Sequence, residues 1–454
     1  MQMTHSTPIS TMTTAATSHE LQDLNNALSR SEIGVHDEHN SPDQTLPPVD
    51  GGIQAWRVLL AAFMFEAILW GFPLSFGIFQ EYYSSLPEFE GSPYITYIGS
   101  IATGIVYMGA PLMAPLVKRF PMYQRHMVVA GWIICLAGMV AGSFADTIGA
   151  LIVTQGVMYG VGYLVIFYPV VSMVNQWWVA RRGLAWGILL GSSGASGVAY
   201  PFIIEALLQK YGYKTTLRAM AIATIVMTGP LLPSMKGRLP ASHRSSLAKT
   251  DWSFIRKPIF WLYIFSTMSQ SLGFYLPSLY LPSYVATAGM QSKFGATLIA
   301  LMNVSSVLGQ FTYGHLSDAR FSLNNLLLST MLVLTIVALA LWGLATSLAT
   351  LVVFALIYGF FAYAFLAMRV RMGTAVASEQ TDTMTMFCLF SFAQGIGNVL
   401  AGPISGALLS PDIDMHGYGL GKYKALVIFT GCAMFANAGF SALAYLVPMK
   451  RNTR

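Results

Sequence analysis

Residues Asn175 to Pro201 read NQWWVARRGLAWGILLGSSGASGVAYP, and this stretch decides the fold. It joins a short basic turn, with Arg181 and Arg182, to an apolar segment that carries four glycines at steps of four, three and three: Gly187, Gly191, Gly194 and Gly197. On an α-helix this spacing places all four on one face, where small residues let a second helix approach closely. The stretch therefore predicts a membrane helix that packs tightly against a partner helix.

The composition of the whole chain agrees with a membrane location. Its 454 residues are 55% hydrophobic and only 10% charged, which is too apolar for a soluble globular protein. The formal charge of +6 comes from basic residues spread over short loops, so we expect no nucleic-acid partner. The three cysteines lie in apolar runs without metal-binding spacing: Cys135, Cys388 and Cys432. We therefore expect neither a disulfide framework nor a metal or redox cofactor.

Twelve stretches are long and apolar enough to cross a bilayer, for which a helix needs about 20 residues. They run over about 56–79, 95–116, 127–145, 149–172, 183–207, 215–234, 259–283, 293–315, 323–345, 348–368, 384–409 and 424–447. The sequence thus predicts an all-α, polytopic membrane protein with twelve transmembrane helices and the lipid bilayer as its surroundings.

A polar segment separates the first six spans from the last six, which predicts two six-helix bundles related by duplication. The expected parts are a disordered cytoplasmic tail over 1–54, an N-terminal bundle over 55–234, a cytoplasmic linker over 235–257, a C-terminal bundle over 258–447 and a second cytoplasmic tail over 448–454. The first tail is polar and lacks the apolar segment of a signal peptide.

The basic residues set the predicted orientation. If the N-terminal tail lies in the cytoplasm, 19 of the 25 Lys and Arg residues fall in cytoplasmic segments and the other 6 fall outside. Such an excess on one side is typical of the cytoplasmic face. We therefore expect an integral protein of the plasma membrane with both termini in the cytoplasm.

The two halves carry matching turns. GAPLMAPLVKRF (Gly109 to Phe120) follows the second span, and GQFTYGHLSDAR (Gly309 to Arg320) follows the eighth. Both resemble the loop signature G-x-L-x-D-R-x-G of the major facilitator superfamily. The first copy has Lys118 where the acid is expected, whereas the second keeps Asp318. The resemblance implies that Asp318 forms a cytoplasmic latch, with Arg320 or a neighbouring helix end, that opens and closes during transport.

Two further motifs resemble signatures of the monocarboxylate porter family, in the form of its fungal branch. Trp177 to Gly187 carries an aromatic pair, a double arginine and L-A-x-G, and Asp50-Gly51-Gly52 precedes the first span with Trp56 downstream. The resemblance covers about residues 50–447, with agreement also at Gly71 to Gly77 and Gly402 to Gly406. It implies a carrier of a small organic acid.

The charges that the proton-coupled lactate and pyruvate carriers of that family use are missing. Local alignment puts Leu74, Asn303 and Val307 at the places of the family's lysine, aspartate and arginine. A simple lactate-type proton symporter therefore does not fit, and a larger or less charged solute is favoured.

Glu66 is the most informative single residue. It lies nine residues after Arg57, about 14 Å along a helix, and hence near the middle of the membrane. A carboxylate there costs about 3 kcal/mol or more, so it normally faces a cavity or a partner. We interpret Glu66 as a proton acceptor or solute ligand, with protons as the candidate coupling ion. The alternative is a structural carboxylate, hydrogen-bonded between helices.

Arginines lie at the ends of two spans. Arg369 and Arg371 are two residues apart on one helix and point in different directions, so at most one reaches a central cavity. Arg369 is the candidate for binding an anion, and the alternative is a gating or orienting charge. Arg181 and Arg182 are interpreted as orienting and gate residues.

Polar and aromatic residues within the spans are candidates for lining the solute path. The amides form two pairs, each compatible with one helix face: Asn303 with Gln310, and Gln394 with Asn398. Hydrogen bonding between helices is an equal alternative for each. An aromatic wall is expected from Tyr163, Phe167, Tyr275 and Tyr363, against the alternative that they pack or face lipid.

These observations predict a secondary-active transporter that moves a small organic solute by alternating access. The chain has no G-x-x-x-x-G-K-S/T loop for ATP, and no catalytic motif that would indicate an enzyme. The solute is interpreted as a monocarboxylate-like compound or an exported secondary metabolite. Two alternatives stay open: a proton-coupled uptake carrier for a carboxylate, and a non-transporting membrane sensor with the same fold.

Overall fold

A computed structural model describes residues 48–89, 92, 94–238, 252–291, 293–319, 321–376, 382–409 and 418–447. All described residues belong to one compact unit, Pro48–Arg454. Most of the expected N-terminal tail, most of the linker, Arg320 and the tail 448–454 therefore lie outside the described residues.

Within these ranges all regular secondary structure is helical, and turns or irregular segments join the helices. The first half of the chain forms α2 (Gly52–Leu74), α3 (Phe76–Ser84), α4 (Ile95–Met108), α5 (Ala110–Arg119), η2 (Pro121–Tyr123), α6 (Gln124–Gly142), α7 (Ile148–Leu151), η3 (Ile152–Met158), α8 (Tyr159–Trp177), α9 (Arg182–Thr228) and η4 (Gly229–Ser234). The second half forms η6 (Trp252–Arg256), α11 (Pro258–Phe274), α12 (Leu276–Thr287), α13 (Lys293–Asp318), α14 (Leu323–Ile336), η7 (Val337–Trp342), α15 (Leu348–Val376), α16 (Asp382–Leu409), η8 (Gly421–Tyr423) and α17 (Lys424–Leu446).

Proline and glycine interrupt several predicted spans. Pro73 lies in the last turn of α2, and the chain resumes as α3 after Ser75. α4 and α5 meet at Gly109 with a bend of 46°. Gly212, at φ 73°, breaks α9 between the predicted fifth and sixth spans, because glycine adopts this left-handed conformation without a steric penalty.

The helices agree with a polytopic membrane protein. In the part of the chain that the structure describes, nine helices are long and apolar enough to cross a membrane, and the bent pair α4 and α5 makes a tenth. Two of the twelve predicted spans are not separate in this count: α9 runs through the fifth and sixth, and the seventh is split into the short helices α11 and α12.

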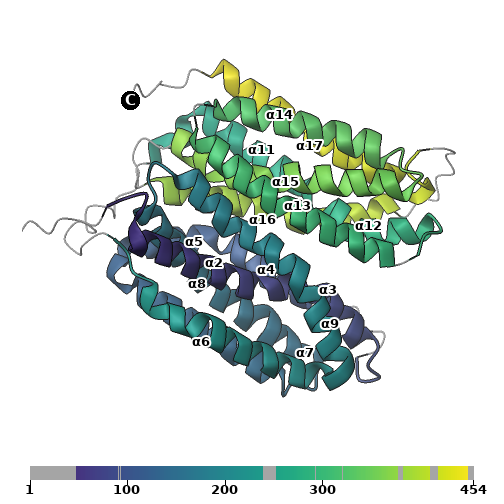
Figure 1. Cartoon of the computed structure of the whole chain (residues 1–454), viewed down its shortest axis with the longest axis horizontal. Helices are drawn as coiled ribbons and strands as arrows, with labels where there is room; N and C mark the ends of the chain where they lie inside the picture. The colour runs from purple at the N-terminus through teal and green to yellow at the C-terminus, as the bar shows by residue number, and fades with distance from the viewer. Residues whose placement is uncertain are drawn as a thin grey trace, which may run out of the picture. The chain divides into compact units, whose positions relative to one another are not determined.

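Buried apolar side chains gather in two cores. One consists of residues between Ala55 and Met235, joined by Val370, Met384, Phe387 and Cys388, and the other of residues between Phe254 and Ala444. Figure 1 shows the helices of the first half, in purple to teal, on one side of those of the second half, in green to yellow. The four residues that cross over belong to α15 and α16, so these helices carry part of the contact between the halves.

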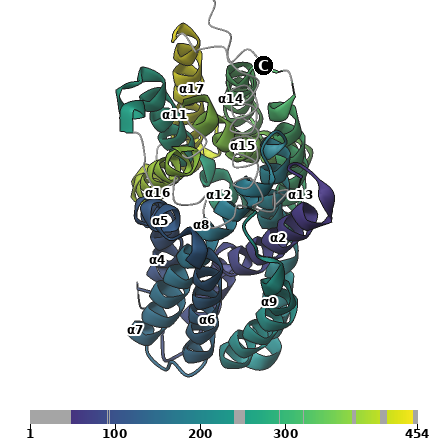
Figure 2. The ribbon, with the colours of Figure 1, turned by 90° about the vertical axis from the view of Figure 1, so that its left-hand side faces the viewer.

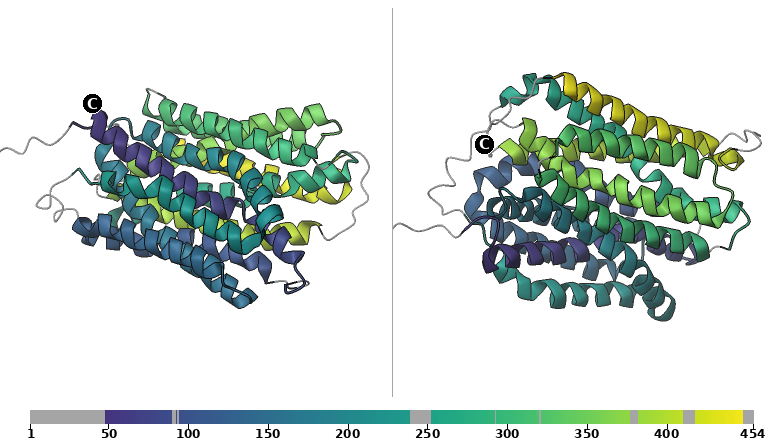
Figure 3. Two further views of the ribbon diagram at one scale, coloured as in Figure 1. Left: turned by 60° about the horizontal axis from the view of Figure 1, so that its bottom comes forward. Right: turned by 45° about the horizontal axis from the view of Figure 1, so that its top comes forward.

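Three helix pairs form most of that contact. α9 packs along α13, and α16 packs against α4 and α5. In Figure 2, which faces the end where α2 begins, α16 lies beside α5. Figure 3 gives the same arrangement from two further directions.

The D-G-G motif and the basic turn, far apart in sequence, form one local structure. The Asp50 carboxylate accepts hydrogen bonds from the backbone N–H groups of Val179, Ala180 and Arg181 at 2.8 to 2.9 Å. The rings of Trp56 and Trp178 meet edge to face, with centroids 5.0 Å apart. Both family signatures therefore fix the start of α9 against the start of α2.

Candidate functional site

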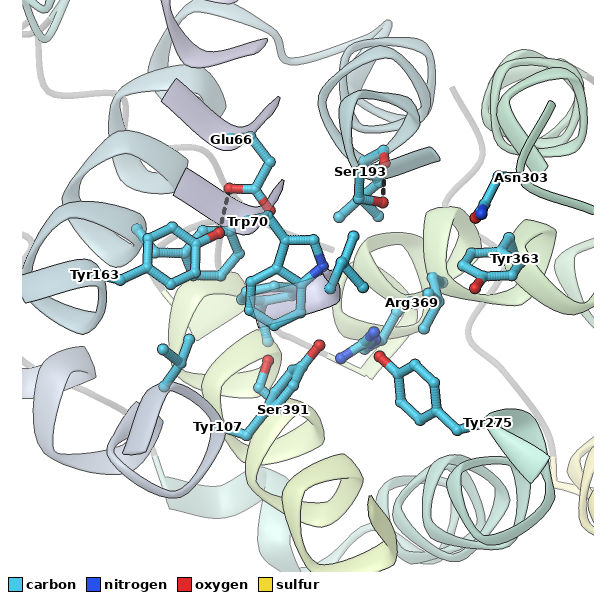
Figure 4. A pocket seen from close by; sticks show the side chains of 16 residues that line it. Glu66, Trp70, Tyr107, Tyr163, Ser193, Tyr275, Asn303, Tyr363, Arg369 and Ser391 are labelled. Carbon is cyan, nitrogen blue, oxygen red and sulfur yellow. Dashed lines mark hydrogen bonds between the residues drawn. The ribbon is translucent and has the colours of Figure 1, made fainter. Parts of the chain in front are cut away.

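A cavity lies between the two halves and is lined by both. Its walls come from α2, α4, α8 and α9 on one side, and on the other from α13, α15, α16 and Tyr275, which lies at the junction of α11 and α12. The 16 lining residues are Glu66, Trp70, Leu74, Val106, Tyr107, Tyr163, Phe167, Leu190, Ser193, Tyr275, Asn303, Tyr363, Leu366, Arg369, Phe387 and Ser391. Figure 4 shows their side chains converging. The cavity measures about 50 Å³, which holds a few waters but not an organic solute.

Glu66 contributes a carboxylate from the first half. The side chain is 7% exposed, and its Oε2 accepts a hydrogen bond from the Tyr163 hydroxyl at 2.6 Å, drawn as a dashed line in Figure 4. Tyr163 lies on α8, so this bond crosses between two helices of the same half. Both interpretations of Glu66 remain compatible with this place: it lines the cavity and is also bonded between helices.

Arg369 contributes a guanidinium from the second half. The side chain is 4% exposed, and its Cζ lies 5.7 Å from the centre of the Phe387 ring. Its buried Nε has no hydrogen-bond partner among the residues that the structure describes. Arg369 and Glu66 form no ion pair among the described residues, and Figure 4 shows Trp70 between them in that view.

Aromatic rings make up much of the remaining wall. The four residues expected to form it all line the cavity: Tyr163, Phe167, Tyr275 and Tyr363. Trp70 packs against Tyr107 and Tyr163, with ring centroids 5.8 and 5.4 Å away. The interior is therefore apolar on its faces and carries hydroxyl groups at ring edges, which suits a flat organic body.

The polar residues expected along the path fall in different places. Asn303 lines the cavity, and its Nδ2 donates to the carbonyl oxygen of Gly197 at 3.3 Å. Gln310, Gln394 and Asn398 are not among the lining residues. The side chains of Gln310 and Gln394 are fully buried and make no hydrogen bond in the described residues. Their role in a solute path stays a prediction.

The glycine face of α9 lies against α13. A Cβ atom added at Gly187 would be 2.5 Å from the carbonyl oxygen of Gln310, and one at Gly194 would be 2.6 Å from the Ser306 hydroxyl. One at Gly191 would meet nothing closer than 3.8 Å. The close approach therefore depends on Gly187 and Gly194, whereas Gly191 has room for a methyl group. Gly197 packs on the Asn303 side chain.

Asp318 closes the same contact at the end where α2 begins. Its two carboxylate oxygens accept the backbone N–H groups of Gly183 and Leu184 at 2.9 and 2.8 Å. These N–H groups belong to the first turn of α9, where helix donors lack internal partners and favour an anion. Of the neighbouring arginines, Arg181 is exposed, and Arg182 is buried and donates to the carbonyl oxygens of Trp178 and Asn175.

A buried ion pair joins the halves at the same end. Lys118 Nζ, in the last turn of α5, lies 3.6 Å from Asp382 Oδ1 at the start of α16, and both side chains are almost fully buried. Lys118 holds the place in the first half that Asp318 holds in the second. The end of α5 thus contributes a cation, Lys118, where the end of α13 contributes an acid, Asp318. The partner of Lys118 is an acid, Asp382, which lies at the start of α16.

Sequence reasoning missed several of these residues. Trp70 follows Glu66 by one helical turn, so the sequence places it on the same face of α2 as Glu66. Phe387 and Ser391 are likewise one turn apart and share a face of α16. The pairing of Lys118 with Asp382 had no sequence signal beyond two charges at span ends. Among the described residues, no three His, Cys, Asp or Glu side chains gather as a metal site would require.

Comparisons with known proteins agree with this architecture. Residues 58–328 match the model of the Major Facilitator Superfamily. The chain is 27% identical to Monocarboxylate transporter 13 of Rattus norvegicus, over 87% of this chain and 90% of that protein. It is 25% identical to the aspyridones efflux protein apdF of Emericella nidulans, over 84% of this chain and 77% of that protein.

A solved structure matches the fold. The transporter FucP in its outward conformation superposes with a TM-score of 0.61 at 13% identity, covering 85% of this chain and 98% of that one.

Proposed function

The chain belongs to the Major Facilitator Superfamily, and from this premise we propose that it is a secondary-active transporter that exports a small organic solute from a fungal cell by alternating access. The observation that carries the proposal is the cavity walled by both halves, with Glu66 from the first and Arg369 from the second. A site shared by two bundles opens to one side or the other when the bundles rock.

The contacts at the end where α2 begins supply the gate. The excess of Lys and Arg in the segments at this end supports a cytoplasmic position, with both termini there. Asp318 on the α9 N-terminus and Lys118 with Asp382 link the two halves at this end, which supports the proposal that they close the cytoplasmic side. Opening it requires both contacts to break, and the smooth glycine face lets α9 move along α13.

Export is supported by the relationship to an efflux protein, and a monocarboxylate-like solute by the relationship to a monocarboxylate transporter. Glu66 is the residue that we propose for proton coupling. The plasma membrane is the proposed location, because export from the cell requires it.

Metabolite profiling of cells with and without the gene tests this function. If the chain is an exporter, its solute should accumulate inside cells that lack the gene, and in the medium of cells that overexpress it. The opposite change would indicate the uptake carrier. Unchanged metabolites in both strains, together with no flux of these compounds in reconstituted vesicles, would contradict transport and favour the sensor.

A further inference from the structure

Gln310 is a buried amide in the contact between α9 and α13. Its side chain is 0% exposed, and neither its Oε1 nor its Nε2 forms a hydrogen bond with a described residue. The side chain faces α9 at Gly191, where a Cβ atom would lie 3.8 Å from Oε1. An amide buried without a partner costs free energy, because it gives up its hydrogen bonds to water. Gln310 therefore weakens the contact in which it lies.

The contact is closely packed on both sides of Gln310, and the nearby hydroxyls are already engaged. Ser306 and Ser317 flank it on α13 and face Gly194 and Gly183 of α9, where a Cβ atom would clash with each hydroxyl. Both hydroxyls donate to carbonyl oxygens of α13 itself. The neighbouring serines therefore supply no hydrogen bond to the amide.

Gln310 lies in the part of the contact that the proposed gate opens. It is eight residues from Asp318, about 12 Å along the helix, and Asp318 ends α13 and binds the start of α9. When the halves rock apart at this end, water reaches the amide and restores its hydrogen bonds. The penalty falls on the closed conformation alone, so it shifts the equilibrium towards the open one.

We propose that Gln310 limits the stability of the cytoplasm-closed conformation, so that the contact between α9 and α13 opens in each transport cycle. This inference rests on the proposed function and assigns a residue to its conformational change. The glycines of α9 bring the helices close together, and Gln310 opposes the closure that they allow.

The first test removes the amide. Gln310→Met keeps the length of the side chain and loses both polar atoms. The matched control is Gln270→Met, because Gln270 is also 0% exposed and its amide also lacks a partner among the described residues. Gln270 lies on α11, which packs mainly on other helices of the second half, so its amide is outside the contact between α9 and α13.

The readout is access to the cavity from the cytoplasmic side. The reporter is Ser193→Cys in the cavity wall, with the exposed Cys432 replaced by serine, in full-length protein reconstituted into vesicles and labelled with a membrane-impermeant maleimide. Gln310→Met should slow labelling about tenfold, and Gln270→Met should leave the rate unchanged. Neither variant should unfold at a lower temperature than the reporter protein, because each loses only an unpartnered amide.

The second test gives the amide a partner. A serine at Gly191 places a hydroxyl within hydrogen-bonding reach of Gln310, whereas an alanine adds only the methyl group for which there is room. Gly191→Ser should therefore slow labelling relative to Gly191→Ala. This difference should vanish when both are combined with Gln310→Met, which removes the partner of the hydroxyl.

An unchanged or faster labelling rate in Gln310→Met, or an equal fall in Gln270→Met, would overturn the inference. A lower Tm for Gln310→Met would also overturn it, because the amide would then have a structural partner. Equal labelling of Gly191→Ser and Gly191→Ala would exclude the missing hydrogen bond as the cause. Labelling and unfolding are independent of transport. A chain that responds as expected but moves no solute would contradict the proposed function alone, and a transporting chain with unaltered labelling in Gln310→Met would contradict this inference alone.

Discussion

At the scale of single residues, Glu66 and Arg369 supply the charges of the cavity from different halves. The positions where related lactate carriers place a lysine and an aspartate are also in the wall, but they hold Leu74 and Asn303. The chain therefore has one acidic and one basic residue in the cavity wall, Glu66 and Arg369, at other positions than those of the lactate carriers. Under the proposed function, a carrier without the usual charges would still present a polar centre to its solute.

Glu66→Gln tests the proposed coupling. The amide keeps the shape and the hydrogen bond with Tyr163 but cannot bind and release a proton. We expect proton-driven transport of the solute, measured in vesicles, to fall more than tenfold, while the variant still inserts into the membrane. Glu205→Gln is the control, because Glu205 is an exposed carboxylate outside the cavity. Undiminished, pH-insensitive flux in Glu66→Gln would remove the coupling role.

Asp50→Asn tests the anchor of the basic turn. Partial burial acts to raise the pKa of Asp50, but the backbone donors Arg181, Ala180 and Val179 and the charge of Arg181 together hold the pKa below its usual 3.8. A lowered folded-state pKa stabilises the fold above the unfolded-state pKa, and this contribution is lost as pH falls through the folded-state pKa. The Tm difference between wild type and variant should therefore be constant from pH 7 to 5 and shrink below about pH 4.

The control for that experiment is Asp146→Asn. Asp146 also forms a close contact, 2.6 Å to Lys214, but both side chains are largely exposed, so the pair contributes little. A Tm loss as large as that of Asp50→Asn would show that the anchor has no special role.

At the scale of elements, the spacing of the glycines on α9 indicated a tightly packed face, and the structure identifies α13 as the partner. The spacing alone did not distinguish the four positions. Only the neighbouring helix does so: a Cβ atom at Gly187 would lie 2.5 Å from the carbonyl oxygen of Gln310, whereas one at Gly191 would make ordinary contacts at 3.8 Å. Helix boundaries follow the same logic: Pro73, Gly109 and Gly212 mark interruptions in the sequence, but their bends depend on packing.

Gly187→Ala and Gly191→Ala form a matched pair one helical turn apart. The methyl group at Gly187 would overlap the backbone of α13, which cannot move aside as a flexible side chain would. We expect Gly187→Ala to reduce export more than tenfold. Gly191→Ala should keep wild-type export, because its methyl group has ordinary contacts and alanine favours helix by up to about 1 kcal/mol. Equal export by both variants, measured at matched protein levels in vesicles, would contradict a close-packed moving face.

At the scale of the whole molecule, the two halves meet through contacts that repeat with reversed charge. Asp318 binds the start of α9 directly, whereas the pair of Lys118 and Asp382 joins α5 to α16. Lys118 departs from the superfamily signature, and Asp382 provides the compensating charge. The departure thus preserves the contact instead of abolishing it.

Charge reversal tests this compensation. Lys118→Asp leaves two buried acids together, and Asp382→Lys leaves two buried cations, so each single variant should lose about 3 kcal/mol or more of stability. The double variant restores an attractive pair and should recover most of the Tm and export. Additive losses in the double variant would show that the two residues do not act as a pair.

A labelling measurement separates stability from gating. A cysteine introduced at Ser193, in the cavity wall, reports access from the cytoplasmic side after the exposed Cys432 is replaced by serine. Its labelling rate should rise in either single variant and return towards the wild-type rate in the double variant. An unchanged rate in all three would contradict a gate at this end.

The sequence by itself determined that this is a polytopic, all-helical membrane transporter of the Major Facilitator Superfamily, and the relationships to fungal transporters and a monocarboxylate transporter confirm that reading. It did so because membrane insertion depends on runs of apolar residues and on basic loops, which are local properties. It also singled out Glu66, because a carboxylate within an apolar run is costly wherever the run folds.

Only the tertiary structure decided which residues meet. Arg369 forms no ion pair with a described residue, Trp70 lies between Glu66 and Arg369 in the view of Figure 4, and Lys118 pairs with Asp382. These facts depend on helices that are hundreds of residues apart in the chain and on the rotation of each helix about its axis. Packing between the two halves determines which helices meet and how each is rotated. The residue periodicity within a single span does not reveal either.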